Sequence, residues 1–125
     1  MTTKILIVED DIDILVTIKE LLESQGYVAE TAHNGMDALE VLKKTMTLPD
    51  LILLDYMMPE MDGATFRVEQ ERDSRIASIP ILLMTADARP DEKQIQIGAR
   101  GSIKKPFDID MFLASIKKCL HVDVP

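Results

Sequence analysis

Acidic, hydroxyl and basic side chains recur in this chain at the points where short aliphatic segments end. They are Glu9, Asp10 and Asp11 after residues 4–8, Asp55 after 51–54, Thr85 and Ala86 after 79–84, and Lys104, Lys105 and Pro106 after 101–103. A charge directly behind a buried apolar run is costly unless it is paired or bound to a cation. If these segments are parallel strands, their carboxyl ends share one edge of a sheet, and the side chains converge there.

Such a convergence of carboxylates predicts a metal site. Like charges in a partly dry cleft repel one another, and either protonation or a bound cation relieves the repulsion. The cluster offers hard oxygen ligands without a nearby histidine or thiolate, which favours Mg²⁺ or Mn²⁺ over zinc. Because Mg²⁺ takes one or two carboxylates and leaves room for phosphate oxygens, the predicted site suits a phosphoryl group.

Asp55 is the natural nucleophile of this site. An aspartate forms an acyl phosphate when the charge on the phosphoryl oxygens is balanced, here by the metal, Lys105, the Thr85 hydroxyl and loop amides. Each motif alone also has a structural explanation. Acidic residues before a helix act as N-caps, Asp62-Gly63 suits a turn, and Lys-Pro ends an extended segment. The prediction therefore depends on the combination and its order along the chain.

Strands and helices alternate in the pattern of apolar residues. Strands are predicted over 4–8, 27–31, 51–54, 79–84 and 101–103, and helices over 12–25, 35–45, 64–73, 90–98 and 109–120. Short continuous aliphatic runs suit strands that are covered on both faces. Asn34 suits the N-cap of the second helix, and Asp11 the start of the first. Five alternations predict a three-layer α/β sandwich with right-handed crossovers.

Composition limits the classes of function. The 125 residues suit a single domain with a core over about 4–120, and the tail after Leu120 is too short for an output domain. A net charge of −8 argues against direct binding of nucleic acid. One cysteine, Cys119, allows no intramolecular disulfide. No apolar run approaches the roughly 18 residues of a membrane span, so we expect no membrane insertion and a cytoplasmic location.

The motifs together resemble a known family. ILIVEDD, LILLDYMMPEMDG, ILLMTA and GARGSIKKPF, at this spacing, are similar to the receiver domain of bacterial two-component response regulators, including chemotaxis regulators. The resemblance implies a flavodoxin-like fold with strand order 2-1-3-4-5 and helices on both faces. It also implies that a sensor histidine kinase or phosphotransfer protein donates a phosphoryl group to Asp55. A stand-alone phosphorelay or chemotaxis protein and a piece of a longer regulator or hybrid kinase both remain open.

The resemblance assigns roles to individual residues. Asp10, Asp55 and the backbone carbonyl of Met57 would bind Mg²⁺ directly, with Mn²⁺ as a possible substitute, and Glu9 would bind it through water. Lys105 would pair with the phosphoryl oxygens, behind a cis bond to Pro106, and Thr85 would be the switch hydroxyl. Lys104 has no role in this alignment, because the family's lysine directly precedes the proline, as Lys105 does.

Ser102 departs from the family pattern. The second switch residue is usually an aromatic, three positions before the lysine, and a serine cannot fill the space that the threonine vacates. Two outcomes stay open. The face formed by helix 90–98, strand 101–103 and the C-terminal helix still changes by loop and helix shifts and binds a downstream protein, or the domain relays phosphate with little conformational output. The protein would be a monomer or a phosphorylation-dependent dimer.

Two other functions compete with this one. A metal-dependent phosphohydrolase with an aspartate nucleophile needs a second aspartate two residues later, where this chain has Met57. A degenerate receiver that acts as a scaffold has only Ser102 in its favour. We therefore expect a phosphoacceptor signalling domain that is no enzyme beyond self-phosphorylation and slow self-dephosphorylation.

Overall fold

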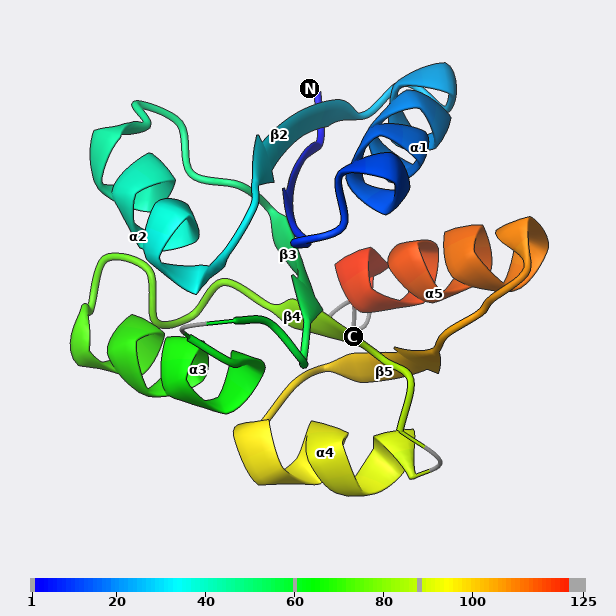
Figure 1. The fold of residues 1–125 in the computed structure, drawn as a ribbon. Helices are drawn as coiled ribbons and strands as arrows, with labels where there is room; N and C mark the ends of the chain where they lie inside the picture. The colour runs from blue at the N-terminus through cyan, green and yellow to red at the C-terminus, as the bar shows by residue number, and fades with distance from the viewer. Residues whose placement is uncertain (1, 60, 88, 122–125) are drawn as a thin grey trace.

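The computed structural model describes residues 2–59, 61–87 and 89–121. Its strands are β1 (Lys4–Val8), β2 (Val28–Ala32), β3 (Leu51–Asp55), β4 (Ile81–Thr85) and β5 (Gly101–Lys104). They form one parallel sheet in the order β2-β1-β3-β4-β5 (Figure 1). The predicted flavodoxin-like strand order is confirmed.

Helices connect successive strands and cover both faces of the sheet. They are α1 (Ile12–Ser24), α2 (Gly35–Lys44), α3 (Gly63–Arg72), α4 (Pro90–Ile97) and α5 (Ile109–His121). Helices α1 and α5 cover one face, and α2, α3 and α4 cover the other (Figure 1). The molecule is therefore the doubly wound, three-layer α/β sandwich that the alternation predicted.

The core divides into two layers because successive strand residues point to opposite faces of a sheet. Ile5 and Ile7 of β1 pack with the α1–α5 side, while Leu6 and Val8 pack with the α2–α3 side. Each layer contains a fully buried phenylalanine, Phe112 on α5 and Phe66 on α3. Full burial of such a side chain contributes about 1.5–3 kcal/mol. This packing fixes the strand ends that carry the polar residues.

Polar caps and turns set the element boundaries. The side chain of Asp11 accepts hydrogen bonds at the start of α1 and that of Asn34 at the start of α2, as predicted. Strand β2 begins one residue later than predicted, because the Tyr27 N–H donates to a carbonyl at the end of α1. Strand β4 begins at Ile81 and not at residue 79, because the Ile79 N–H closes a turn and Pro80 has no N–H.

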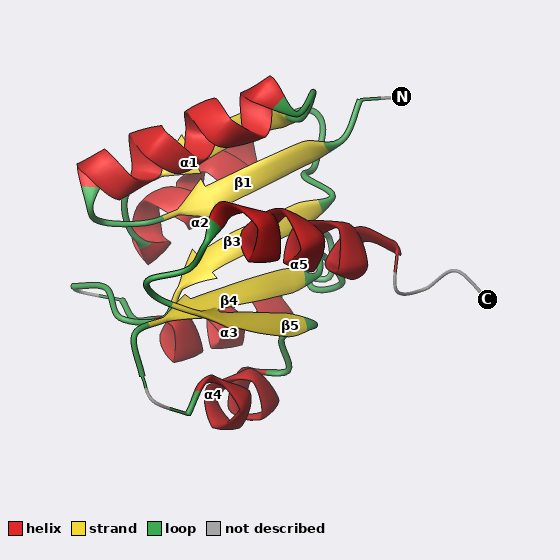
Figure 2. Cartoon of the chain, turned by 90° about the vertical axis from the view of Figure 1, so that its right-hand side faces the viewer, coloured by secondary structure: helices red, strands yellow, loops and turns green. Residues whose placement is uncertain are grey.

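All strands point the same way, so their carboxyl ends form one edge of the sheet (Figure 2). The chain segments that leave β1, β3, β4 and β5 toward the next helix all begin at this edge. Asp55 and Thr85 are the last residues of their strands. Among the described residues, no helix is long and apolar enough to cross a bilayer.

Candidate functional site

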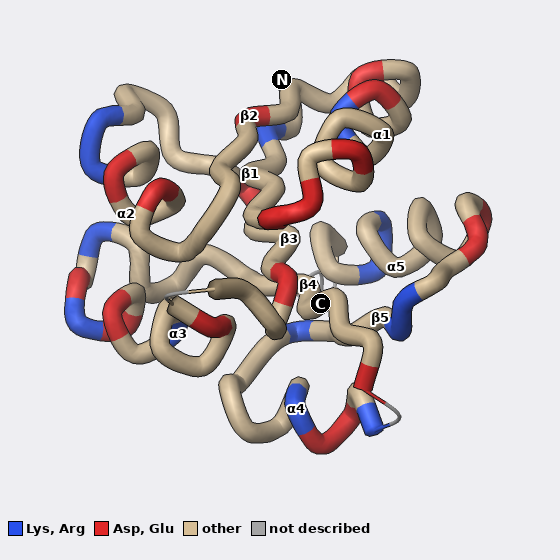
Figure 3. The backbone as a smooth tube through the Cα atoms, in the orientation of Figure 1, with Lys and Arg blue, Asp and Glu red and all other residues tan. Residues whose placement is uncertain are grey.

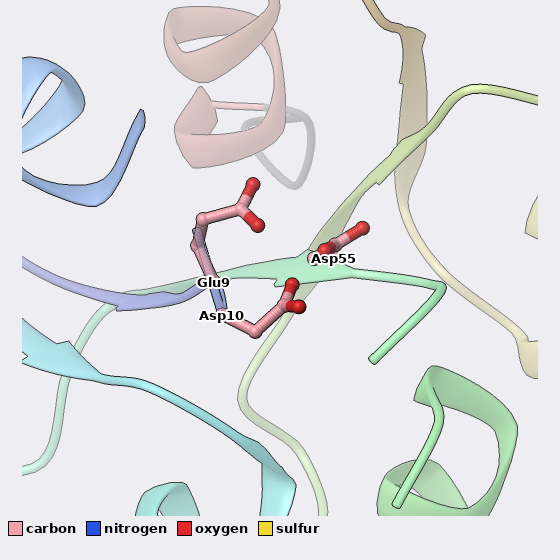
Figure 4. A group of neighbouring side chains, drawn as sticks. All are labelled: Glu9, Asp10 and Asp55. Atoms are coloured by element: carbon pink, nitrogen blue, oxygen red, sulfur yellow. The ribbon is translucent and has the colours of Figure 1, made fainter. Parts of the chain in front are cut away.

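Three carboxylates meet at the carboxyl edge of the sheet (Figure 4). Oxygens of Glu9, Asp10 and Asp55 lie within 4.8 Å of one another. Strand β1 lies beside β3, with Val8 opposite the residue before Asp55, and this pairing brings the carboxylates together. Glu9 is 1% exposed and Asp55 4%, whereas Asp10 faces solvent. Figure 3 shows the acidic stretch of chain that runs from this point into α1.

Lys105 places a cation beside two of these carboxylates. Its Nζ donates a hydrogen bond to Glu9 Oε1 at 2.5 Å and lies 3.4 Å from Asp55 Oδ1. Its backbone N–H donates to the Thr85 carbonyl, and the following bond to Pro106 is cis, as the resemblance implied. Burial lowers the pKa of Lys105, but the hydrogen bond to Glu9 and the charges of Asp55 and Glu9 outweigh burial and raise it. The ammonium therefore stays charged at neutral pH.

The charge of the Lys105 ammonium does not balance the negative charge of the carboxylates in this site. Burial, together with the hydrogen bond and charge of Glu9, raises the pKa of Asp55 to about 8, although the charge of Lys105 acts in the opposite direction. Without a further cation, the Asp55 carboxyl is mostly protonated at neutral pH. A divalent cation at this point would favour its ionised form.

The donor set fits Mg²⁺ better than a soft metal. The cluster consists of carboxylates, and Lys105 already engages one of them, Glu9. Asp10 and Asp55 then remain as direct ligands, which matches the one or two carboxylates that Mg²⁺ usually takes. Because Asp10 is exposed, the remaining coordination positions are open to water or to phosphate oxygens.

Met57 follows Asp55 by two residues, and Thr85 ends β4, the strand that pairs with the strand of Asp55. Thr85 is fully buried at the end of β4, and its hydroxyl oxygen accepts a hydrogen bond from the Asp87 N–H at 3.1 Å. The Met57 N–H donates to Asp55 Oδ1 at 3.3 Å, while its side chain is 67% exposed. Their roles as switch hydroxyl and carbonyl ligand stay predictions.

Ser102 and Lys104 lie outside the cluster. Ser102 sits in the middle of β5, and its hydroxyl donates to Gln94 Oε1 of α4 at 2.9 Å. Lys104 ends β5 with an exposed side chain. Of the three residues, Lys105 is the one whose side chain contacts the carboxylates.

The sequence analysis missed Tyr56. This residue directly follows Asp55 and is 8% exposed. Gly63 packs so closely on it that an added Cβ would lie 3.1 Å from the Tyr56 Cα. The ammonium of Lys93, on α4, lies 5.0 Å from the centre of the tyrosine ring. The partners come from separate segments, so the only signal in the sequence was an aromatic ring beside the acceptor.

The chain belongs to the response regulator receiver domain family, which it matches over residues 5–117. It is a receiver domain of the kind found in two-component signal transduction. Sporulation initiation phosphotransferase F of Bacillus subtilis is 36% identical over 124 residues, covering 96% of this chain and 95% of that protein. Several other curated relatives are about twice as long, and the chain spans only 49–51% of their length.

Solved structures agree with this assignment. The chemotaxis protein CheY4 of Vibrio cholerae has 32% sequence identity and a TM-score of 0.87, with 96% of this chain and 100% of that chain covered. The response regulator TrrA of Thermotoga maritima, solved with Mg²⁺ and BeF, has 29% identity and a TM-score of 0.82, with coverage of 95% and 100%.

Proposed function

We propose that this receiver domain accepts a phosphoryl group on Asp55 in a Mg²⁺-dependent reaction. The observation that carries the proposal is the buried Asp55 carboxyl, with carboxylate oxygens of Glu9 and Asp10 within 4.8 Å and the Lys105 ammonium 3.4 Å away. The similarity to a protein solved with Mg²⁺ and BeF supports it. The donor would be the phosphohistidine of a sensor histidine kinase or of a phosphotransfer protein.

The transfer forms one bond and breaks one. A carboxylate oxygen of Asp55 bonds to phosphorus while the bond from phosphorus to the donor nitrogen breaks, and the nitrogen keeps the electron pair. Asp55 must be ionised for this step, and its raised pKa opposes ionisation in the absence of metal. Asp10, Asp55 and the Met57 carbonyl would hold Mg²⁺, with Glu9 through water, and the metal would supply positive charge that favours the ionised carboxylate and the phosphoryl oxygens.

Lys105 and Thr85 would stabilise the product. In this structure the Lys105 ammonium contacts Glu9 and lies near Asp55. After phosphorylation it would donate one of its hydrogen bonds to a phosphoryl oxygen instead. The Thr85 hydroxyl would turn to donate to another phosphoryl oxygen. A phosphoryl group carries nearly two negative charges, so it provides the new contact that a two-state change requires.

An apolar cleft suggests where the donor docks. A cavity of about 490 Å³ lies beside the site, between α1 and the segment Lys105–Phe107, and it is lined by Ile14, Ile18 and Phe107. We propose that the donor protein binds here, and that the face of α4, β5 and α5 serves a downstream protein. We propose further that the protein works in the cytoplasm, and that any dimerisation depends on phosphorylation.

Incubation of the purified protein with acetyl phosphate tests the proposal. Intact-mass analysis should show a single phosphoryl adduct in the presence of Mg²⁺ and none after chelation of the metal. If a folded protein that binds Mg²⁺ takes up neither this phosphoryl group nor beryllofluoride, the domain is a scaffold and the proposal fails.

Replacement of the two adjacent lysines should separate their roles. Lys105→Ala removes the ammonium that lies 3.4 Å from Asp55, and we expect phosphoryl uptake to slow by about 100-fold, as when one charge-stabilising donor is lost. Lys104→Ala removes an equal charge from an exposed side chain and should change the rate less than about 2-fold. The rate of adduct formation by mass spectrometry measures both. The opposite ranking would contradict the assignment of Lys105.

A further inference from the structure

Helix α4 is firmly held at its C-terminal end. Helix α3 lies beside α4 (Figure 1). Arg67 of α3 donates from Nε to the Ile97 carbonyl at 2.9 Å. Gly98 ends the helix in the left-handed conformation, with φ 71°, and its N–H donates back to the carbonyls of the last turn. The Arg67 side chain is only 18% exposed, so this anchor is shielded from water. The end of α4 is therefore a fixed point.

The start of α4 has weaker support. Its N-cap residue, Arg89, makes no side-chain capping hydrogen bond, and the first helical residue is Pro90, which has no N–H. The loop before it is connected to the site by the hydrogen bond from the Asp87 N–H to the Thr85 hydroxyl oxygen. The predicted switch hydroxyl thus already binds the chain that leads into α4.

A side-chain contact also joins α4 to the residue after the acceptor. The Lys93 ammonium lies 5.0 Å from the centre of the Tyr56 ring, within the range of a cation–π interaction. The Tyr56 hydroxyl donates to Gln96 Oε1 of the same helix at 3.4 Å. The Tyr56 N–H donates to the carbonyl of Met84, the residue before Thr85. Tyr56 therefore lies between the acceptor strand, the switch strand and α4.

We propose that the contact between Tyr56 and Lys93 couples the phosphorylation site to α4, in a chain that lacks an aromatic residue at position 102. When Thr85 turns its hydroxyl toward the phosphoryl group, the Asp87 N–H loses its acceptor. The loop shifts, the weakly held start of α4 moves about the end that Arg67 holds, and Lys93 leaves the Tyr56 ring. This inference rests on the proposed function, because the phosphoryl group provides the contact that differs between the two states.

Ser102 also contacts α4, but without a side chain that could act as a switch. Its hydroxyl donates to Gln94, on the same helix as Lys93. A serine has no ring that can move between an exposed and a buried position, whereas the Tyr56 ring contacts α4 through Lys93 and Gln96. Lys93 and Tyr56 are accordingly positioning residues, which act on the helix and not on the phosphoryl group.

Amide hydrogen exchange of peptides that cover α4 tests the coupling, in protein with and without acetyl phosphate and Mg²⁺. In the wild type, phosphorylation should speed exchange in α4. Lys93→Gln should speed it about 2- to 5-fold before phosphorylation, the range that loss of a partly exposed cation–π contact allows. In Lys93→Gln, phosphorylation should then cause no further increase in the rate of amide exchange in α4. Lys93→Arg keeps a cation over the ring and should restore the wild-type difference, whereas Lys43→Gln on α2, a matched loss of charge, should change nothing.

Tyrosine fluorescence gives a second readout. The chain has no tryptophan and two tyrosines, so Tyr27→Phe leaves Tyr56 as the only source of tyrosine fluorescence. Phosphorylation should make Tyr56 more accessible to quenching by acrylamide. In Lys93→Gln, acrylamide should quench Tyr56 fluorescence to this higher extent both before and after phosphorylation.

The adduct mass, measured on the same samples, separates the possible failures. If no adduct forms, the proposed function is wrong and this inference falls with it. If the adduct forms but Lys93→Gln keeps the wild-type difference in exchange, or speeds exchange equally in both states, the coupling is wrong and the proposed function stands.

Discussion

Asp55→Asn is expected to abolish phosphoryl uptake while the protein stays folded. An amide is a poor nucleophile and cannot form the acyl phosphate, whereas its size matches the carboxyl and Lys105 keeps its hydrogen bond to Glu9. Intact-mass spectra over a time course with acetyl phosphate and Mg²⁺ should show no adduct. Circular dichroism of the same samples should match the wild type.

A neighbouring aspartate provides the control. Asp62 lies on the same edge of the sheet and caps α3 through a hydrogen bond from the Thr65 N–H, a role that asparagine fills equally well. Asp62→Asn should therefore take up phosphate at nearly the wild-type rate. If Asp55→Asn still gains the adduct at this rate, another residue is the acceptor.

The same substitution should stabilise the metal-free protein. The pKa of Asp55 is raised from 3.8 to about 8, chiefly by burial and by Glu9, so the folded protein holds a proton that the unfolded chain releases. At pH 8 this difference disfavours folding by on the order of a few kcal/mol. Asparagine carries no charge in either state, so Asp55→Asn removes the cost and should raise the free energy of unfolding.

Because folding raises the pKa of Asp55, the stabilisation by Asp55→Asn depends on pH. Between the unfolded pKa of 3.8 and the folded pKa of about 8, the folded state binds more protons, so the stability of the wild type falls as the pH rises. The gain from Asp55→Asn should be absent below about pH 4, grow through this window and level off above pH 8.

Urea unfolding in the presence of a chelator at several pH values measures this gain. Asp62→Asn should not reproduce it. Saturating Mg²⁺ should stabilise the wild type and have little effect on Asp55→Asn, because a cation that binds only the folded state adds stability by mass action. A gain that is independent of pH would contradict the charge-based explanation.

Much of the fold follows from local patterns in the sequence. Continuous aliphatic runs predicted β1, β3 and β4, whereas β2 and β5 have mixed sequences with weaker patterns. Asp11 and Asn34 predicted two helix starts, because capping is a local interaction. Helices α3 and α4 have the sparsest apolar patterns, and for α3 the structure gives a physical reason. Its buried face includes Gln70, whose amide donates to the Ile76 and Ile79 carbonyls, so a polar residue occupies a core position.

The sequence predicted which side chains meet at the carboxyl edge of the sheet, but not the contacts that they make there. The positions at strand ends and the family resemblance predicted Asp55 and Lys105, and the structure brings both residues together with Glu9 and Asp10. The hydrogen bond from Lys105 to Glu9 and the position of Lys93 over Tyr56 join distant segments of chain. Such contacts depend on how helices and loops pack in three dimensions, which spacing along the chain does not encode.

Direct location of the phosphoryl group tests the central claim most directly. The protein is incubated with acetyl phosphate and Mg²⁺, the acyl phosphate is reduced with borohydride, which converts a phosphorylated aspartate to homoserine, and the peptides are sequenced by tandem mass spectrometry. We predict homoserine at position 55 alone, and only in samples that contained Mg²⁺. Homoserine at another aspartate, or equal conversion without the metal, would contradict the assignment of Asp55 as the Mg²⁺-dependent phosphoacceptor.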